Sequence, residues 1–289
     1  MCREVAANGG AGWYRACAAD RRALRLAHRP QPAKLCRCPR LRAVVESKLE
    51  RRWSPEQIAG WLTASYPDDP EMRVSHETIY LSLFVQARGA LRKELARHLR
   101  SGRARRRPRG LSVRNGRGQL RGTAHISQRP AEANDRAVPG HWEGDLLFGT
   151  RSSTVATLVE RKSRFVLLVG LPGSHTADVV ADALAKAIAT LPEQLRRSLT
   201  WDQGKEMAGH ARFSVATGVP VYFCDPHSPW QRGSNENTNG LLRQYFPRST
   251  DFRAVTQSDL DAVAAELNDR PRQTLEWKSP CQALDQALR

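Results

Sequence analysis

The sequence contains no apolar run that approaches the roughly 18–20 residues needed to cross a membrane, and it begins without an apolar signal core. Cysteine is scarce as well: none of the six cysteines forms a C-x-x-C pair, and Cys36 and Cys38 lie too close together for a usual zinc knuckle. These absences argue against a membrane protein, a disulfide-stapled secreted domain and a zinc finger. A cytoplasmic protein is expected, and 289 residues suffice for one large domain or two to three small ones.

Acidic residues are outnumbered in only one half of the chain. Residues 141–289 contain 17 Lys/Arg and 17 Asp/Glu, so the whole net charge of +17 lies in residues 1–140. A basic front and a neutral back indicate a module that holds a polyanion, followed by a module that acts on it. The alternative is a basic tail that only keeps the protein soluble.

The basic half has the pattern of short capped helices. Residues 41–51 place their apolar side chains on one helical face, and the segment 54–57 (SPEQ) is a capping box that opens a second helix. A third helix is predicted over 75–85. Three short helices in a basic context indicate a helix-turn-helix module, with the third as its recognition helix. The candidate DNA contacts are Ser75, His76 and Thr78. The alternative is a three-helix bundle that does not contact DNA.

A long arginine-rich stretch follows. A further helix is predicted over 89–99, and residues 100–129 then hold ten Arg and no acidic residue. Such a segment cannot bury a core, so a flexible linker that also tracks phosphates is expected. The run Arg105, Arg106 and Arg107 supplies its candidate DNA contacts.

The neutral half alternates strands with helices. Strands are predicted over 141–149, 154–160, 164–171, 198–202 and 221–223. Helices are predicted over 176–190 and 205–217, through the stretch 227–247, and over 259–269 with Ser258 and Asp261 as possible caps. This order, βββαβαβα with one more helix, predicts a mixed α/β sheet domain preceded by an all-α region.

Three acids stand where these elements meet. Asp145 interrupts the apolar first strand, Asp202 ends the fourth strand, and Glu236 lies one turn into the helix after the fifth. The first and fourth strands are neighbours in such a sheet, so their acids can converge, with Glu236 brought over them. Converging carboxylates repel one another unless a cation is bound, and an all-oxygen set suits Mg²⁺ or Mn²⁺. Two such ions support phosphodiester displacement.

The alternative for each acid is structural: a turn-facing Asp145, a strand cap at Asp202 and a solvated Glu236 favoured by the helix dipole. Strand alternation puts Glu143 on the face of Asp145, where it can support the metal ligands. The candidate DNA contacts near the acids are Lys205, Arg232, Asn235 and Asn237. At the hairpin turn, Arg161, Lys162 and Arg164 are expected to be exposed charges.

Five segments carry a family resemblance. They are PGHWEGDLL (139–147), TLVERKSRFVLL (157–168), LTWDQGKEMAGH (199–210), YFCDPHSPWQRGSNENTNGLLRQYFP (222–247) and LNDRPRQTLEWKSP (267–280). In this order they resemble the DDE transposases of bacterial insertion sequences, in the family numbered thirty. The separation of 34 positions between Asp202 and Glu236 is the characteristic gap of that family.

The resemblance implies a ribonuclease-H-like catalytic domain that binds two Mg²⁺ ions, or Mn²⁺ in their place, through Asp145, Asp202 and Glu236. It also implies DNA partners, namely the terminal inverted repeats of the element and the target DNA, and a homo-oligomer that bridges two DNA ends. The protein would then work in the bacterial cytoplasm, at the nucleoid, and would need no membrane.

The resemblance also suggests domain boundaries. The first residues look like the tail of a first helix-turn-helix module whose recognition helix contains Met1, so we expect an N-terminal truncation. The predicted units are 1–39, the remnant of that module; 40–99, a second helix-turn-helix module; 100–138, the basic linker; and 139–289, the catalytic domain.

The predicted function is a Mg²⁺-dependent transposase, which cleaves DNA at the ends of an insertion sequence and joins the 3′-hydroxyl to target DNA. Two alternatives remain open. One is a ribonuclease-H-type nuclease without strand transfer, and the other is a truncated product that acts only as a DNA-binding protein or repressor.

Overall fold

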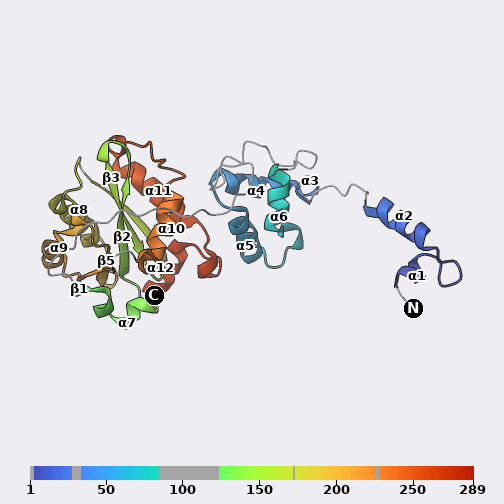
Figure 1. Cartoon of the computed structure of the whole chain (residues 1–289), viewed down its shortest axis with the longest axis horizontal. Coiled ribbons are helices and arrows are strands. Elements are labelled where there is room, and N and C mark those ends of the chain that lie inside the picture. Colours follow the sequence, from blue (N-terminus) through green and yellow to red (C-terminus); the bar gives the residue numbers. More distant parts are fainter. Residues whose placement is uncertain (1–2, 28–33, 85–123, 172, 226–227) are drawn as a thin grey trace.

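The computed structural model describes residues 3–27, 34–84, 124–171, 173–225 and 228–289 (Figure 1). The helix predicted over 89–99 and the run Arg105, Arg106 and Arg107 lie outside these residues. No helix in the described ranges is long and apolar enough to span a membrane.

Residues 34–84 form a helical module around one apolar core. Its elements are α3 (Lys34–Arg37), α4 (Pro39–Glu50), α5 (Pro55–Ser65), the 3-10 turn η1 (Pro70–Met72) and α6 (His76–Phe84). Ser54 and Gln57 form the predicted capping box, which satisfies free amides at the start of α5. Leu49, Ile58 and Ile79 come from three different helices and are fully buried together. Two further helices, α1 (Arg3–Ala7) and α2 (Ala16–Ala27), precede this module.

Residues 124–289 form a second unit, the sheet domain, built on one six-stranded mixed sheet. Its strands are β1 (Ala124–His125), β2 (His141–Phe148), β3 (Thr154–Glu160), β4 (Val166–Gly170), β5 (Ser198–Trp201) and β6 (Val221–Phe223). In the sheet they lie in the order β1-β6-β5-β2-β3-β4. β2, β3 and β4 are antiparallel, whereas β5 pairs parallel to β2 and β6 parallel to β5. The predicted ribonuclease-H-like mixed sheet is confirmed. The first and fourth predicted strands correspond to β2 and β5, and their predicted adjacency is confirmed as well.

The sheet domain begins earlier than the predicted boundary at residue 139. β1 pairs parallel to β6, and α7 (Ala131–Asn134) follows it. Arg129, placed in the linker by the sequence analysis, is 7% exposed and donates from Nη1 to Thr200 Oγ1 at 3.0 Å. The linker prediction failed here because a two-residue strand has no alternation to detect, and the arginine-rich composition looked like solvated coil.

Helices cover both faces of the sheet (Figure 1). α8 (Ala177–Ala189) and α9 (His210–Thr217) pack on one face, against Trp142, Leu199 and other side chains. α10 (Gly233–Leu242) and α11 (Gln257–Asp269) pack on the other, where Leu147 points. Side chains alternate along β2, so Glu143 and Asp145 share the face of Leu147 and lie under α10.

Some predicted helices differ in detail. The helix predicted over 205–217 is a 3-10 turn, η7 (Lys205–Met207), followed by α9. The stretch 227–247 contains the turn η8 (Pro229–Arg232) and then α10, which ends at Leu242. Thr256, rather than Ser258 or Asp261, caps α11. A final helix, α12 (Pro280–Leu288), was not predicted.

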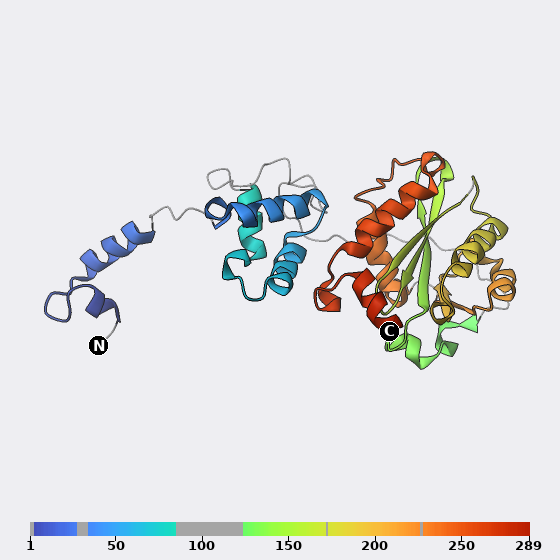
Figure 2. The same cartoon turned by 180° about the vertical axis from the view of Figure 1, so that it is seen from behind.

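The helical module contacts the sheet domain on the side that carries α10, α11 and α12 (Figure 2). Gln57 Nε2 donates to Pro271 O at 3.0 Å, and Arg51 forms an ion pair with Asp269. Trp277 packs so closely on Gly60 that an added Cβ would lie 2.2 Å from its ring. The two units therefore meet through specific contacts.

Candidate active site

The pairing of β2 with β5 brings two of the predicted acids together. The two strands run parallel with Glu143 opposite Thr200. Asp145 lies two residues after Glu143, within β2. Asp202 lies two residues after Thr200, directly after the end of β5. Because the strands advance in step, the two aspartates reach the same place at the centre of the sheet, beneath the start of α10.

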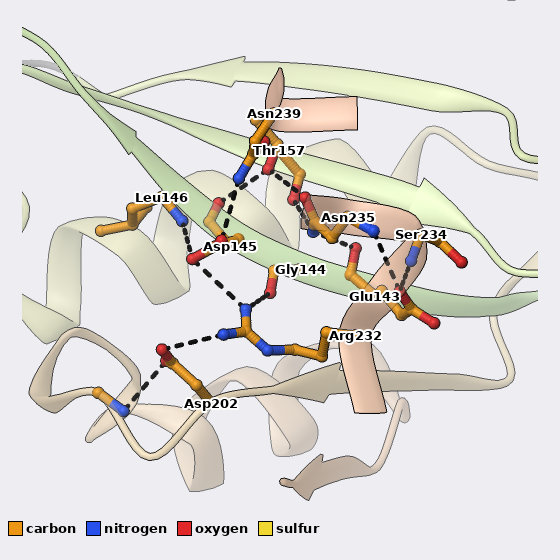
Figure 3. Close-up of polar contacts among 11 residues, drawn as sticks. Glu143, Gly144, Asp145, Leu146, Thr157, Asp202, Arg232, Ser234, Asn235 and Asn239 are labelled. Atoms are coloured by element: carbon orange, nitrogen blue, oxygen red, sulfur yellow. Dashed lines mark hydrogen bonds and ion pairs between the residues drawn. The ribbon is translucent and has the colours of Figure 1, made fainter. Parts of the chain in front are cut away.

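Arg232 joins the two aspartates (Figure 3). Its Nη1 lies 3.4 Å from Asp145 Oδ1, and its Nη2 lies 3.1 Å from Asp202 Oδ2. Nη1 also donates to Gly144 O at 3.0 Å, and the residue is only 8% exposed. One buried guanidinium thus offsets part of the repulsion between the two carboxylates.

The surroundings of Asp145 favour a positive charge close to its carboxylate. Burial raises the pKa of this carboxyl above its usual range, Arg232 opposes the rise, and Asp202 adds to it. Leu146 N donates to Oδ1 at 2.9 Å, and Asn239 Nδ2 donates to Oδ2 at 3.0 Å. Asp202 is more open to solvent and accepts from Gly204 N at 3.1 Å. A buried carboxylate beside a second carboxylate is stable only with positive charge at hand.

Glu236 is not brought to the pair. It is exposed in the first turn of α10, and the described residues contain no group of three His, Cys, Asp or Glu side chains that could hold a metal. The side chain of α10 that reaches Asp145 belongs to Asn239, three residues later. Sequence reasoning missed Asn239. Its spacing from Glu236, one helical turn, was the available signal.

Glu143 holds the start of α10. It is 1% exposed, and Oε2 accepts from the backbone nitrogens of Ser234 and Asn235 at 3.1 and 3.2 Å. No side chain caps this helix at its N-cap position, so Glu143 takes that role from β2. Its other oxygen pairs with Arg161. Glu143 therefore supports the segment that carries Arg232, Glu236 and Asn239.

The hairpin arginines are not the exposed charges expected from the sequence. Arg161 is buried against Glu143, and Arg164 donates to Ser234 Oγ and is partly buried. The expectation was wrong because the β3–β4 turn folds back toward the start of α10, a contact between segments about 70 residues apart.

Asn235 does not face DNA. It is 0% exposed, donates from Nδ2 to Glu143 O at 2.9 Å, and accepts at Oδ1 from Thr157 Oγ1 at 2.9 Å. Its predicted DNA contact was therefore wrong: the amide ties α10 to β2 and β3. The guanidinium of Arg232, predicted to contact DNA, is bound to carboxylates instead.

The other predicted contacts within the described residues are exposed or half-buried. Lys205 and Asn237 are exposed. In the helical module, Ser75 and His76 are exposed at the start of α6, and Ser75 Oγ accepts from Thr78 N at 3.2 Å. Their roles remain predictions.

The aspartate pair fits a divalent cation. Both carboxylates direct oxygens toward a single positive group, the Arg232 guanidinium, which stands where a cation is needed. Carboxylate oxygens without sulfur or imidazole are the donors that Mg²⁺ and Mn²⁺ prefer. Asp145 and Asp202 are therefore the residues best suited to hold such an ion.

Comparison with known proteins agrees with this geometry. Residues 135–229 match the family described as "Integrase core domain", a segment that includes both aspartates and ends before Glu236. The chain is 47% identical, over 100% of its own length and 76% of the other protein, to "Transposase InsI for insertion sequence element IS30A" of Escherichia coli (strain K12). It is 50% identical, over 99% of its length and 84% of the other, to "Transposase for insertion sequence element IS1086" of Cupriavidus metallidurans.

Among solved structures, the catalytic core domain of BIV integrase aligns with 18% identity and a TM-score of 0.39, covering 51% of this chain and 95% of that one. At the sequence level the match extends along nearly the whole chain and most of each curated relative. The chain belongs to the family of insertion-sequence transposases that includes these two proteins.

Proposed function

We propose that this protein is a divalent-metal-dependent transposase, which cleaves DNA at the ends of an insertion sequence and joins the freed 3′-hydroxyl to target DNA. One observation carries the proposal: in a member of a transposase family, Asp145 on β2 and Asp202 at the end of the parallel strand β5 both form an ion pair with Arg232. Its membership of that family supports polynucleotidyl transfer as the class of reaction.

The reaction exchanges one phosphodiester bond for another. In cleavage, a water oxygen attacks phosphorus and the bond to the 3′-oxygen breaks, which leaves a 3′-hydroxyl. In joining, that hydroxyl attacks a target phosphate and a target P–O bond breaks. Mg²⁺ or Mn²⁺ ions held by Asp145 and Asp202 would activate the attacking oxygen and stabilise the leaving one. No covalent protein–DNA link is required, so no nucleophilic side chain is assigned.

Glu236 is proposed as the third metal ligand. It precedes Asn239 by three residues on α10, so the two side chains are neighbours on the helix surface. Asn239 already contacts Asp145. The proposal therefore requires the exposed Glu236 side chain to turn toward Asp145 when metal and DNA bind.

Arg232 has two positions in this proposal. Without metal it neutralises the aspartates. With metal bound, the same guanidinium would be released from them and would be free to contact a DNA phosphate, the role predicted from the sequence.

The DNA partners in this proposal are the terminal inverted repeats of the element and a target duplex. The helical module, through α6, is the proposed contact with the repeats. A homo-oligomer is proposed because one active site cannot hold two DNA ends for joining.

A strand-transfer assay tests the function. Purified protein, Mg²⁺, a labelled pre-cut element end and a target plasmid should give joined product, which Asp202→Asn and Glu236→Gln should abolish. Asp285→Asn, which alters an exposed acid on α12, is the matched control and should retain activity. Cleavage without joining would favour a nuclease. DNA binding without either reaction would favour a protein that only occupies DNA.

A further inference from the structure

A polar cavity of about 430 Å³ lies beside the aspartate pair. Its lining includes His125, Arg129, Arg136, Glu143, Arg161 and Gln231. None of these residues was singled out as a DNA contact by the sequence, and four of them belong to segments that the sequence analysis assigned to a linker or to an exposed turn.

The cavity and the aspartates share one face of the sheet. Glu143, which lines the cavity, precedes Asp145 by two residues on β2. On β5, Thr200 lies opposite Glu143 and holds Arg129 of the cavity through a 3.0 Å hydrogen bond. Two residues of strand span about 7 Å. The cavity is therefore about one nucleotide step from the place where the aspartates would hold the scissile phosphate.

The charge of the cavity is not balanced within the protein. Arg161 pairs with Glu143, and His125 pairs with Asp225. For Arg129 and Arg136, by contrast, no described carboxylate lies within ion-pair distance. With His125 neutral, the three arginines of the lining outnumber its two carboxylates, Glu143 and Asp225, by one positive charge.

Arg129 is both buried and incompletely bonded. Nη1 donates to Thr200 and Nη2 to Asn134, but its buried Nε has no hydrogen-bond partner. Burial lowers the pKa of Arg129 to about 10, and the nearby positive charge of Arg161 contributes, yet the group stays charged at neutral pH. A buried charge is costly when its hydrogen bonds are incomplete and the nearby carboxylate, Glu143, is already paired with Arg161. An anion that enters the cavity would remove that cost.

Arg136 also lines the cavity. It is exposed and has a left-handed backbone conformation, φ 60°, which non-glycine residues rarely adopt. It lines the cavity together with Arg129 and Arg161, so the three guanidinium groups approach one space from the segment before β2 and from the β3–β4 turn.

We propose that this arginine pocket, formed by Arg129, Arg136 and Arg161, binds a backbone phosphate of the DNA next to the scissile phosphate. The inference rests on the proposed function and adds a subsite to it. Guanidinium groups present paired N–H donors that match phosphate oxygens, and a backbone phosphodiester is the anion that the reaction places one step away. The pocket would set the register of the strand over the aspartates.

The test measures DNA binding without catalysis. Fluorescence anisotropy in EDTA would follow a labelled duplex that carries the end of the encoding element. Arg136→Gln is the main variant, because its side chain is exposed and its loss leaves the fold intact; Arg129→Gln is the second, with thermal unfolding as a check. We expect several-fold weaker binding and a salt dependence whose slope is shallower by about 1. Arg289→Gln, which replaces another exposed arginine, should change neither the affinity nor the salt slope.

A neutral methylphosphonate, placed in turn at each phosphate around the cleavage site, locates the contact. At one position the methylphosphonate should weaken binding of DNA by the unchanged protein. The same substitution should not weaken binding by Arg136→Gln any further. The pocket proposal is overturned if every position weakens the variant and the unchanged protein equally, or if the salt slope is unaltered. Strand transfer by the unchanged protein is scored separately, so failure of the transposase proposal and failure of the pocket remain distinguishable.

Discussion

Arg232 offsets part of the repulsion between Asp145 and Asp202. Both carboxylates touch its guanidinium, and Asp145 is the more deeply buried of the two. A bound divalent ion would perform the same neutralisation. Arg232 and the metal are therefore expected to compete for one place, and the competition can be measured through stability.

The first prediction concerns Arg232→Gln. In EDTA the variant should lose about 1–3 kcal/mol of unfolding free energy, because two carboxylates are left without their cation; partial exposure of Asp202 keeps the loss below that of a fully buried pair. Urea unfolding with and without Mg²⁺ measures it. Mg²⁺ should stabilise the variant more than the unchanged protein. An equal effect of Mg²⁺ on both proteins would contradict the competition.

A second prediction concerns Cys224. Burial raises the pKa of this thiol to about 11, whereas Cys17 and Cys36 are exposed. Because the pKa is raised, only about one Cys224 in a thousand is a thiolate at pH 8. Iodoacetamide at pH 8, followed by peptide mass spectrometry, should label the exposed thiols of Cys17 and Cys36 and spare Cys224. Labelling of all three at similar rates in the folded protein would be inconsistent with this environment.

At the residue scale, the sequence could indicate the two aspartates but not their neighbours. Asp145 is conspicuous because it interrupts an apolar strand, and Asp202 because it ends one. The sequence singled out Arg232 and Arg161 for other roles, and the only signal for Asn239 was its helical spacing from Glu236. Their partners lie 18 to 94 positions away, and only the folded sheet brings them together.

At the scale of elements, the start of α10 depends on a carboxylate from β2. Glu143 accepts from two free amides of the helix and pairs with Arg161. This helix carries Glu236, the proposed third ligand, so its position should matter to metal binding.

Paired variants of Glu143 give the third prediction. Glu143→Ala should cost about 3–5 kcal/mol, because it leaves the buried Arg161 charge unpaired and two helix amides unsatisfied. Glu143→Gln keeps an acceptor for the amides and should cost less. Denaturant unfolding gives the energies, and hydrogen exchange at Ser234 and Asn235 gives the local effect. Equal losses, with unchanged exchange at both amides, would argue against a capping role.

Elements with regular periodicity were predictable, and short ones were not. β2 through β6 and α8 matched their predicted ranges to within a few residues. β1, with two residues, is specified by its pairing with β6 rather than by its own composition. α12 begins with a Ser279–Gln282 capping box of the kind recognised at Ser54, so its signal was present and was overlooked.

At the scale of the whole molecule, the helical module contacts the segment that follows α10. Arg52 at the α4–α5 turn donates to Gln244 O and stacks over the Tyr245 ring at 4.2 Å, just beyond the end of α10. The module that is proposed to bind the element end therefore touches the segment that follows the proposed metal-binding helix. The sequence predicted the two units but contained no pattern that reported their contact.

Zero-length crosslinking supplies the fourth prediction. Arg51→Lys places an amine opposite Asp269, so a carbodiimide should join the two residues. Adding Gly60→Leu should abolish the crosslink, because the new side chain would occupy the place of the Trp277 ring. Mass spectrometry identifies the joined peptides, and thermal unfolding checks that both units stay folded. A crosslink that persists in the double variant would mean that the Gly60–Trp277 contact does not hold the units together.

The guanidinium between the aspartates also has a practical consequence for timing. Because Arg232 places positive charge beside both aspartates, we expect the fold to tolerate chelator, so that protein and DNA can be mixed before metal is added. Adding Mg²⁺ would then start every assembled complex at the same moment. The addition of Mg²⁺ would then set the start of the reaction, and the order of cleavage and joining can be followed from a synchronous start.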